Sequence, residues 1–402
     1  MGITKMYTSV NGVSKEAQTV YVPYNGEALK IWPLGSSGPT GTYTVKLNLS
    51  DSNPATWGTY EDDAAGMTAG DSLFDSFFGY YPCILQNGTE LGKLNPANFT
   101  QYEDGTTAPI TTLGNDVMTY FPRRGLKIWK ADGYLYVSIT AEEGLTGYEY
   151  DAFTYKGDDC DGFYRGCYKG YVSSNALYSI SGQTPTTSIT IGNYRTYARA
   201  RGTGYEQSAF YQLTYLQAMY LIKYRGQNAQ NVIGRGFVDG NSAIYGATGY
   251  TNDKGMDWGE STGKYPMKLF GQEDFYGNIY EFIDGIWSNA NRQLSASDGN
   301  YNDTGSGYTD LGTSTFSSNI SGYLMDVNGT THAGFTPSSQ SYGSETTYFC
   351  DAATVYASRM AYFGGNWTNG SNAGVFRLYV NPTASYSNTN CGARLMFMKT
   401  AA

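Results

Sequence analysis

Hydrophobic and polar residues alternate along several short segments of the first 140 residues, which is the pattern of strands with one buried face. Every second residue from Tyr43 to Leu49 is apolar, and a strand-like run follows at 81–85 after a short apolar patch at 73–78. Between residues 116 and 140, an Arg-Arg-Gly turn and an Ala-Asp-Gly turn separate three more strand-like runs. These segments predict the start of a β-rich globular domain.

A short repeat opens the chain. Residues 7–12 and 21–26 are two extended segments that each run into Asn-Gly, the dipeptide typical of hairpin turns. We therefore predict two hairpins, which are too small to fold alone and need a partner surface. Residues 33–41, PLGSSGPTG, predict a linker.

Helical periodicity is clear in one segment, residues 206–225, with Gly226 where a C-terminal cap is expected. One stripe of this predicted helix consists of Phe210, Leu213, Gln217, Tyr220 and Tyr224. Turn signals recur every few residues afterwards, above all from 295 to 344. We predict an α+β fold with far more loop than regular structure, and loops on this scale normally serve a function.

Composition narrows the range of functions that the chain could have. The chain has 402 residues, 40% hydrophobic and 16% aromatic, with 39 tyrosines and a net charge of −9. This length allows two domains, or one large domain with an appended module. Because Lys and Arg form no run, we expect neither nucleic acid nor an anionic membrane as a partner. No apolar run reaches the length of a membrane span, so we expect no membrane insertion, and the first ten residues lack the apolar core of a secretory signal.

The cysteines and the single histidine argue against a zinc site. No CxxC pair exists among the five cysteines, and His332 is the only histidine. Cys160 and Cys167 could form a local disulfide, but reduced thiols in a chain made in a reducing cytoplasm are the better expectation. We expect no cofactor. The acidic residues Asp158, Asp159 and Asp161 predict a solvated turn or a weak structural calcium site. The five cysteines are Cys83, Cys160, Cys167, Cys350 and Cys391.

The segment 362–395 has the composition of a recognition surface. From Tyr362 to Gly392 only Arg377 is charged, and Tyr, Asn, Ser and Gly dominate, as they do in antibody binding loops. Tyrosine supplies rigid amphipathic contact area, while Asn and Ser supply adaptable hydrogen bonds. An ordinary Asn/Gly-rich loop is the alternative.

Three segments carry a resemblance to a known family: residues 205–224, the run EDFYGNIYEFIDGIW at 273–287, and Gly-Gly-Asn-Trp at 364–367 leading to Gly-Ala-Arg-Leu at 392–395. In order and spacing they resemble the C-type-lectin-like fold in its formylglycine-generating-enzyme-like branch. The middle run is similar to that family's D-x-x-G-N-x-x-E-W-x-D signature, with Phe282 in place of the Trp. The resemblance implies a loop-rich C-type-lectin-like fold of the α+β class, preceded by small β-rich N-terminal modules.

Other segments resemble phage proteins. Residues 53–140 resemble a module of phage tail proteins, the N-terminal repeat resembles repeats of tail and baseplate proteins, and the C-terminal segment resembles the variable region of proteins diversified by retroelements. That last resemblance implies a fixed scaffold of Gly364, Gly365, Trp367, Gly370, Ala373, Gly374, Phe376, Gly392 and Arg394. It also implies exposed, ligand-binding variable positions at Tyr362, Asn366, Thr368, Asn369, Asn372, Arg377, Tyr379, Asn381, Tyr386, Asn388 and Asn390.

The resemblances together imply a phage tail receptor-binding protein. We expect an attachment module at 1–35, a β-rich connecting module at 36–112 and a ligand-binding C-type-lectin-like domain at 113–402. The expected partners are a host cell-surface protein or glycan, tail or baseplate proteins and two further copies of the chain in a homotrimer, because tethered weak sites gain avidity. The expected location is the tail tip of a virion assembled in the bacterial host cytoplasm.

Two rival functions follow from the same residues. The family's namesake enzyme needs a close thiol pair near the start of the last segment, where this chain has no cysteine and Cys391 stands alone. We therefore expect no enzyme, and no Ser/His or Cys/His nucleophile unless His332 is placed for one. A structural tail or baseplate subunit without a variable site is the other rival, although an assembly interface should be more apolar.

Individual residues leave alternatives open. On a strand, Arg377 is expected to point outward while Phe376 and Leu378 point inward. We also expect that Arg377 and Tyr379 do not share one face, so one of the proposed site residues could be misplaced. Tyr379 and Tyr386 could be core residues instead. Glu281 and Asp284 could bind a metal, but a framework in which Asn278 and Glu281 satisfy buried backbone groups is the stronger expectation.

Overall fold

The computed structural model describes residues 7–10, 13–16, 20–24, 27–31, 40–56, 58–241 and 243–400. The chain divides into two compact units, Met1–Thr40 and Gly41–Ala402. The first unit contains two antiparallel hairpins, which confirms the prediction from the repeat. Residues 11–12 and 25–26, where the turns are expected, and most of the predicted linker lie outside the described residues. The hairpin strands are β1 (Tyr7–Val10) with β2 (Val13–Glu16), and β3 (Val20–Tyr24) with β4 (Glu27–Ile31).

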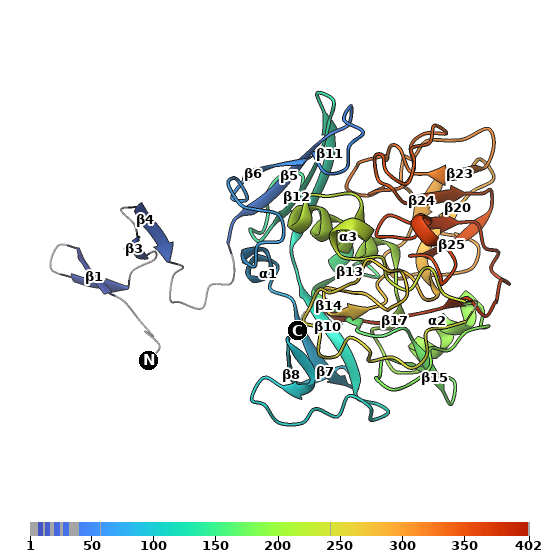
Figure 1. Cartoon of the computed structure of the whole chain (residues 1–402), viewed down its shortest axis with the longest axis horizontal. Helices are drawn as coiled ribbons and strands as arrows, with labels where there is room; N and C mark the ends of the chain where they lie inside the picture. The colour runs from blue at the N-terminus through green and yellow to red at the C-terminus, as the bar shows by residue number, and fades with distance from the viewer. Residues whose placement is uncertain are drawn as a thin grey trace. The chain divides into compact units, whose positions relative to one another are not determined.

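Two antiparallel sheets hold the N-terminal strands of the second unit, and one of them also includes strands from the middle and the end of the chain (Figure 1). One runs in the order β17-β28-β14-β10-β7-β8-β9, with β13 paired to β14. The other runs β11-β12-β5-β6. The first sheet contains β17 (Tyr205–Gln207), β28 (Leu395–Thr400), β14 (Asp158–Gly166), β10 (Asp116–Pro122), β7 (Tyr81–Gln86), β8 (Thr89–Asn95), β9 (Asn98–Tyr102) and β13 (Thr154–Tyr155). The second contains β11 (Gly125–Ala131), β12 (Tyr134–Thr140), β5 (Thr42–Asn48) and β6 (Gly58–Asp62).

These sheets confirm the strands predicted at 43–49, 81–85 and 116–140. Tyr43, Val45 and Leu47 of β5 are buried, as their alternation predicts. Asn87 and Gly88 join β7 to β8 with φ values of 48° and 76°, and this left-handed pair suits a tight hairpin. β7 lies before residue 112 and pairs with β10 after it. The boundary predicted between 36–112 and 113–402 therefore runs through one sheet, and the three-module division remains a prediction.

A second eight-stranded sheet holds the C-terminal segments in the order β22-β21-β20-β25-β26-β24-β23. It is mixed, because β27 pairs parallel with β20, and β24 pairs parallel with β26. Its strands are β20 (Tyr280–Ser288), β21 (Leu294–Ala296), β22 (Thr309–Asp310), β23 (Ile320–Tyr323), β24 (Ala352–Val355), β25 (Arg359–Phe363), β26 (Leu378–Val380) and β27 (Cys391–Gly392). Two small hairpins pair β15 (Tyr171–Ser173) with β16 (Ala176–Tyr178), and β18 (Lys268–Leu269) with β19 (Gln272–Glu273).

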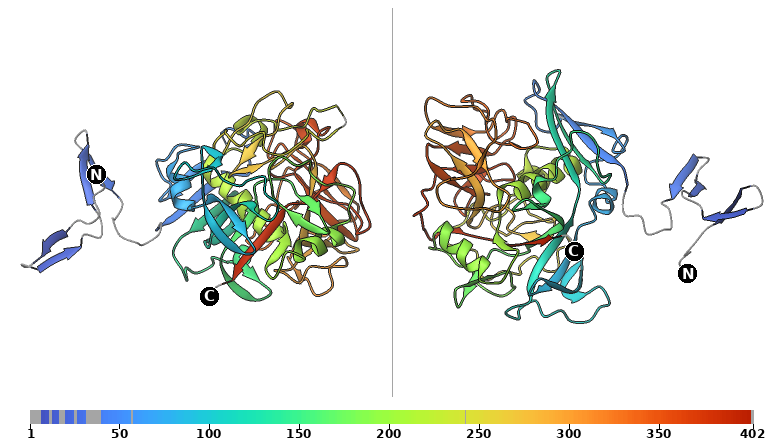
Figure 2. Two further views of the ribbon diagram at one scale, coloured as in Figure 1. Left: turned by 90° about the horizontal axis from the view of Figure 1, so that it is seen from below. Right: turned by 180° about the vertical axis from the view of Figure 1, so that it is seen from behind.

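The predicted helix is α3 (Phe210–Tyr224), which packs between the four-stranded sheet and β20 (Figures 1 and 2). It is buried on nearly all sides, so the single predicted stripe was too narrow a description. Some of its polar side chains bond to loops: Gln217 Nε2 donates to the Val375 carbonyl at 2.7 Å. The left-handed residue at its end is Arg225, with φ 53°, and not Gly226 as predicted.

Three further α-helices and two 3₁₀ turns were not predicted. The patch at 73–78 is α1, which buries Phe74, Phe77 and Phe78. Six residues are too few to show a helical period, so this helix could not be predicted from periodicity. The others are α2 (Ile191–Arg199), α4 (Ala229–Val232), η1 (Asp151–Phe153) and η2 (Gly370–Asn372), and α1 spans Leu73–Phe78.

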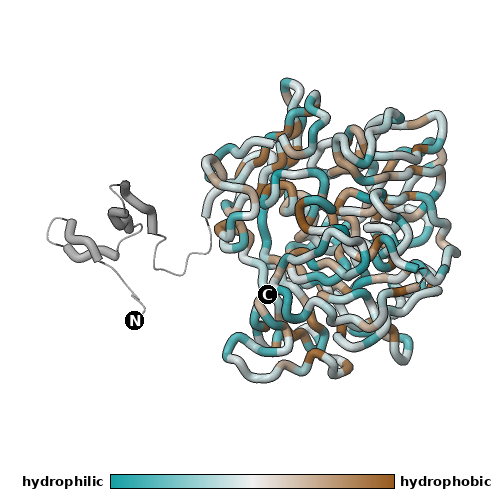
Figure 3. Tube along the Cα trace, viewed as in Figure 1, coloured by the Kyte–Doolittle hydropathy of each residue, from teal (hydrophilic) through white to brown (hydrophobic). Residues whose placement is uncertain are grey.

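The fold is β-rich with few helices and long irregular connections, as expected for a loop-rich α+β protein. Its assignment to the C-type-lectin-like fold remains a prediction. Figure 3 shows hydrophobic and hydrophilic positions interleaved along the second unit. Within the described residues, no helix is both long and apolar enough to cross a membrane.

Candidate ligand-binding site

Four tyrosines form a cluster where β20, β25 and β26 lie side by side. Tyr362 of β25 and Tyr379 of β26 are directly paired residues, and their rings stack with centroids 5.8 Å apart. The ring centroid of Tyr280 lies 4.1 Å from that of Tyr362, and the centroid of Tyr386 lies 6.0 Å from it. Tyr280 and Tyr362 are 5% and 7% exposed, whereas Tyr379 and Tyr386 are half-buried. This tyrosine cluster therefore has a buried inner pair that supports a partly exposed outer pair.

Arg377 holds the cluster from within. It is only 2% exposed, and its guanidinium lies 4.2 Å from the Tyr379 ring centroid. Nη2 donates to the Tyr280 hydroxyl at 2.9 Å and Nη1 to the Asn372 carbonyl at 2.7 Å. Nε has no hydrogen-bond partner, and no carboxylate pairs with Arg377 among the described residues. Arg377 positions the outer ring of Tyr379 and does not face the solvent.

The loop at 366–369 is closed by its own asparagines. Asn369 Oδ1 accepts the backbone N–H of Asn366 at 2.8 Å, and Asn366 Oδ1 accepts the N–H of Thr368 at 3.1 Å. Such side-chain to backbone bonds replace regular structure in tight turns. Asn366 therefore shapes this turn, and Thr368 is the residue that it exposes.

The structure brings some of the predicted site residues together. Tyr362, Tyr379, Tyr386, Arg377 and Asn372 meet at the cluster, and the Tyr386 hydroxyl donates to Asn390 Oδ1 at 3.4 Å. Asn366, Thr368 and Asn369 share the separate turn. The exposed members of the predicted set are Thr368 and Asn388, and the half-buried ones are Asn369, Asn372, Tyr379, Asn381, Tyr386 and Asn390.

The prediction of exposure was wrong for Tyr362, Asn366 and Arg377, which are all buried. The strand argument failed for Arg377 because β26 begins at Leu378, so strand alternation does not set the direction of the preceding side chain. The role of all eleven residues in ligand binding stays a prediction.

A buried ionic network fixes the frame behind the site. Glu281 of β20 binds Arg165, Lys169 and Arg394, with Lys169 Nζ at 3.0 Å and Arg394 Nε at 2.8 Å. Burial alone would raise the pKa of Glu281, but the three cations outweigh it and hold that pKa well below its usual range. Burial lowers the pKa of Lys169 to about 8. A paired and fully hydrogen-bonded carboxylate of this kind is a structural element.

Arg394 ties three segments to this network. Its guanidinium donates to the carbonyls of Gly166, Glu273 and Asp274 at 2.9, 2.8 and 3.0 Å. It therefore joins the end of β14 to the hairpin β18–β19 and to β20. Of the nine predicted scaffold residues, all except Gly370 are buried.

Residues of the signature-like run at 273–287 also make buried hydrogen bonds that hold the loops in place. Asp284 accepts two hydrogen bonds from Arg195 at 2.7 and 2.9 Å. Asn278 donates to Asp274 at 2.7 Å, and its Oδ1 accepts the N–H of Tyr245 at 3.0 Å. The framework prediction is confirmed for Asn278, which satisfies a backbone group. Glu281 instead binds side chains, so that part of the prediction was wrong.

The potentially reactive groups are paired or buried, including Cys391, which pairs with Tyr280 of the cluster. All five cysteines are free and buried, so the possible Cys160–Cys167 disulfide does not form. Burial raises the pKa of Cys167 to about 11 and that of Cys391 well above its ordinary value. His332 lies apart from them, with Nδ1 bound to Asp151 at 2.6 Å. In the described part of the chain, no group of three or more His, Cys, Asp or Glu residues could hold a metal ion.

The sequence prediction missed Tyr280 and the exposed polar residues Thr383, Ser385, Ser387 and Thr389. Tyr280 stands directly before Glu281 in the signature-like run, where its side chain is assigned to the core by default. Its parallel pairing with Cys391 brings it to the C-terminal segment, and this pairing leaves no local signal in the sequence.

No family model matches the chain, and no curated protein sequence is similar to it. Solved structures that are similar to it include the Major Tropism Determinant P3c variant, with 11% identity and a TM-score of 0.29 over 98% of this chain and 80% of that chain. The U1 variant has 12% identity and a TM-score of 0.29 over 100% and 82%. Treponema denticola variable protein 1 has 9% identity and a TM-score of 0.30 over 72% and 98%.

TM-scores of 0.29 and 0.30 do not establish a common fold. The proposal below therefore rests on the site itself.

Proposed function

We propose that this chain is a phage tail receptor-binding protein that recognises a host cell-surface protein or glycan without covalent chemistry. The observation that carries the proposal is the tyrosine cluster, in which buried Tyr280, Tyr362 and Arg377 support the half-exposed rings of Tyr379 and Tyr386. Rigid aromatic anchors of this kind dominate binding energy at interfaces. The adjoining exposed Ser and Thr residues of 383–389 supply adaptable hydrogen bonds.

We further propose that the C-terminal face is diversified by a retroelement. The proposal is supported by the separation of a buried scaffold, which includes Trp367 and Arg394, from outward positions such as Thr368 and Asn388. The side chains at these two positions bond within their own loops, Thr368 Oγ1 to Asn366 Oδ1 and Asn388 Oδ1 to the Thr389 N–H, so substitutions there remove no hydrogen bond of the buried scaffold. A reverse-transcriptase gene in the encoding genome, with a near-duplicate of the 3′ end that differs at adenines, is the expected finding; without both, the face is invariant.

The remaining parts of the proposal concern assembly. The N-terminal unit attaches the chain to the tail or baseplate, the protein acts at the tail tip of the virion, and it forms a homotrimer. Three tethered copies turn weak single sites into tight attachment through effective concentration. Sedimentation of the purified full chain tests this directly, with a mass three times that of the chain expected.

A competition experiment tests receptor binding. The purified full chain should block adsorption of the phage to its host cells, and a Tyr379→Ala, Tyr386→Ala variant should block at least about tenfold less well at equal concentration. The control variant, Tyr134→Ala with Tyr136→Ala, removes two half-buried tyrosines of β12 outside the site and should block as the unaltered chain does. Equal blocking by all three proteins refutes the site, and failed particle assembly in phage that carry the first variant favours a purely structural subunit.

A further inference from the structure

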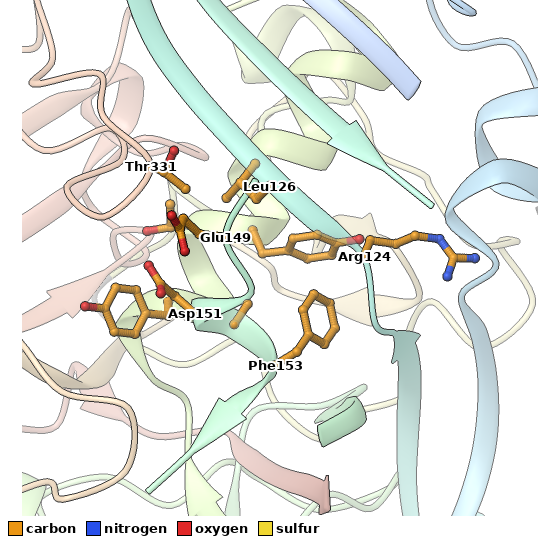
Figure 4. Close-up of a pocket in the computed structure, with 10 residues that line it drawn as sticks. Arg124, Leu126, Glu149, Asp151, Phe153 and Thr331 are labelled. Atoms are coloured by element: carbon orange, nitrogen blue, oxygen red, sulfur yellow. The ribbon is translucent and has the colours of Figure 1, made fainter. Parts of the chain in front are cut away.

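A pocket lies outside the C-terminal segment 362–395, and we call it the Phe237 pocket after one of the rings that line it. Its volume is about 350 Å³, within the range of pockets for small organic ligands. Its lining includes Phe237, Asp239, Ile244, Tyr245 and Lys264. The smaller cavity drawn in Figure 4 has a volume of about 10 Å³, which is room for one water molecule and no ligand.

The Phe237 pocket adjoins the turn at 366–369, which belongs to the predicted site. The Gly240 N–H donates to the Trp367 carbonyl at 2.6 Å, so the backbones of the pocket and the turn are joined directly. Phe237 and Trp367 also belong to one small hydrophobic cluster. A ligand that fills the pocket therefore reaches the turn and its exposed residue Thr368.

Aromatic rings form a wall that continues outward from the pocket. The Tyr245 ring lies edge-on to Phe237 with centroids 5.2 Å apart, and it lies 6.3 Å from the ring of Tyr265. Tyr265 stacks on Tyr250 with centroids 5.6 Å apart, and Trp258 lies 5.9 Å from Tyr250. Tyr265 is 38% exposed, and Tyr245, Tyr250 and Trp258 are half-buried. The chain thus holds a flat apolar surface open beside a pocket of molecular size.

Two charged side chains give the same pocket hydrogen-bonding groups. Asp239 pairs with Arg235 Nη1 through Oδ2 at 2.6 Å, and its Oδ1 has no hydrogen-bond partner in the described part of the chain. The exposed Lys264 ammonium donates to the Asp239 carbonyl. Because an ammonium group has three donors, two of them remain for a ligand. The pocket therefore offers a free acceptor and free donors next to an aromatic wall.

This combination matches the chemistry of a sugar ring. A hexopyranose has an apolar face of C–H bonds and a rim of hydroxyl groups that both donate and accept hydrogen bonds. An aliphatic side chain of a protein would cover Asp239 and Lys264 without giving them partners, which costs free energy. A small ion would leave the aromatic wall uncovered.

We propose that the Phe237 pocket binds one neutral hexopyranose unit of a cell-surface glycan, stacked on Tyr245 and hydrogen-bonded to Asp239 and Lys264. The inference rests on the proposed function for the source of the glycan, the host surface. Every lining residue of the pocket precedes residue 362. The pocket therefore takes the same sugar in every diversified form of the chain, while the turn at 366–369 contacts the adjoining part of the ligand.

Calorimetric titration of the full chain tests the proposal, with the methyl glycosides of galactose, glucose, mannose and N-acetylglucosamine as probes. At least one of them should bind at millimolar concentration. Sorbitol has the hydroxyl groups without the ring, and cyclohexanol has a ring with a single hydroxyl group. Both should bind at least about tenfold more weakly than that glycoside, because each lacks half of the matching chemistry.

Two variants remove the two kinds of contact. Tyr245→Ala removes the aromatic wall, and Lys264→Met removes the ammonium group at an exposed position where folding does not depend on it. Each should weaken binding of the glycoside about tenfold or more. The control variant Tyr342→Ala removes a tyrosine that is 45% exposed and lies outside the pocket, and it should bind like the unaltered chain. Thermal melts of each variant check that it is folded.

The proposal is overturned if none of the four glycosides binds or if all three variants bind alike. Equal binding of cyclohexanol or N-acetyl-leucine amide also overturns it, because the pocket then takes an apolar side chain of a protein. The Tyr379→Ala, Tyr386→Ala chain should keep its glycoside binding, and a loss there would move the sugar to the tyrosine cluster. The proposed function fails separately: a chain that binds the glycoside in this pocket but does not block adsorption refutes the receptor-binding role alone.

Discussion

Tyr379 is the residue of the site whose contributions to ligand binding and to stability can best be measured separately. Its ring stacks on Tyr362 and accepts the guanidinium of Arg377, but its hydroxyl has no hydrogen-bond partner in the described residues. The ring thus belongs to the fold, while the hydroxyl is free for a ligand.

Tyr379→Phe should therefore leave the free energy of unfolding unchanged within about 0.5 kcal/mol. The same substitution should weaken ligand binding by about 1 kcal/mol, because a hydrogen bond to the ligand is lost. Chemical denaturation and competition for adsorption measure the two effects. A loss of stability with unchanged binding would mean that Tyr379 is only a core residue.

The site could be predicted from the sequence only in part. Composition predicted a recognition surface at 362–395. The alternative in which Tyr379 and Tyr386 are core residues is partly right, because both side chains are half-buried. Burial of Arg377 could not be predicted, since it depends on the Tyr280 hydroxyl and the Asn372 carbonyl meeting it in space. Asn366 was misplaced because its turn-forming hydrogen bonds look like ordinary surface composition in the sequence.

At the scale of elements, Arg394 and its buried ionic network hold together the strands that lie behind the tyrosine cluster. Short strands with period-two alternation, such as β5, could be predicted, whereas two-residue strands such as β18 and β27 leave no pattern to detect. Side-chain networks hold these short elements in place. The resemblance placed Arg394 in the scaffold, but its partners became visible only in the structure.

Arg394→Lys should lower the free energy of unfolding by about 3 kcal/mol. Lysine cannot reproduce the planar set of donors that reaches Glu281 and three carbonyl groups, so buried acceptors are left unpaired. Arg359→Lys is the matched control, because among the described residues the Arg359 side chain of β25 donates only to the adjacent Ser358 carbonyl. This control should change stability by less than about 0.5 kcal/mol. Equal melting temperatures for the two variants would contradict the structural role of the network.

Asp274, at the same junction, predicts a pH dependence. Burial, with the nearby Glu273 charge, raises its pKa to about 7, and its Oδ1 has no hydrogen-bond partner in the described residues. Between about pH 4 and pH 7 the folded state therefore binds a proton that the unfolded state has released, so stability falls as the pH rises through that window.

Asp274→Asn should remove this contribution and flatten the stability profile between about pH 4 and pH 7, by roughly 1 to 4 kcal/mol at the upper end. Asparagine tolerates the positive φ of 51° at this position and can still accept from Asn278. Denaturation curves at several pH values measure the effect. An unaltered profile in the variant would show that Asp274 is ionised in the folded protein throughout this range.

At the scale of the whole molecule, residues 41–402 form one compact unit. One hydrophobic core joins Val45 of β5 and Phe74 of α1 to α3 and to the C-terminal sheet. Local patterns predicted its strands but not this continuity, because pairings such as β7 with β10 join distant segments.

A fragment of residues 41–402 should therefore unfold in a single cooperative transition, whereas a fragment of residues 113–402 should not fold, because it lacks β5, β7 and α1. Circular dichroism melts of the two fragments measure this difference. Cooperative melting of the shorter fragment would restore the predicted boundary at residue 112.

The central claim is that the outer pair of the tyrosine cluster attaches the particle to its host. The most direct test is the adsorption rate of phage particles that carry Tyr379→Ala with Tyr386→Ala, measured beside particles that carry Tyr134→Ala with Tyr136→Ala. We predict normal yields of intact particles for both, with adsorption at least about a hundredfold slower for the first alone, since loss of two anchors is multiplied by loss of avidity. Equal adsorption rates for the two kinds of particle would contradict the account.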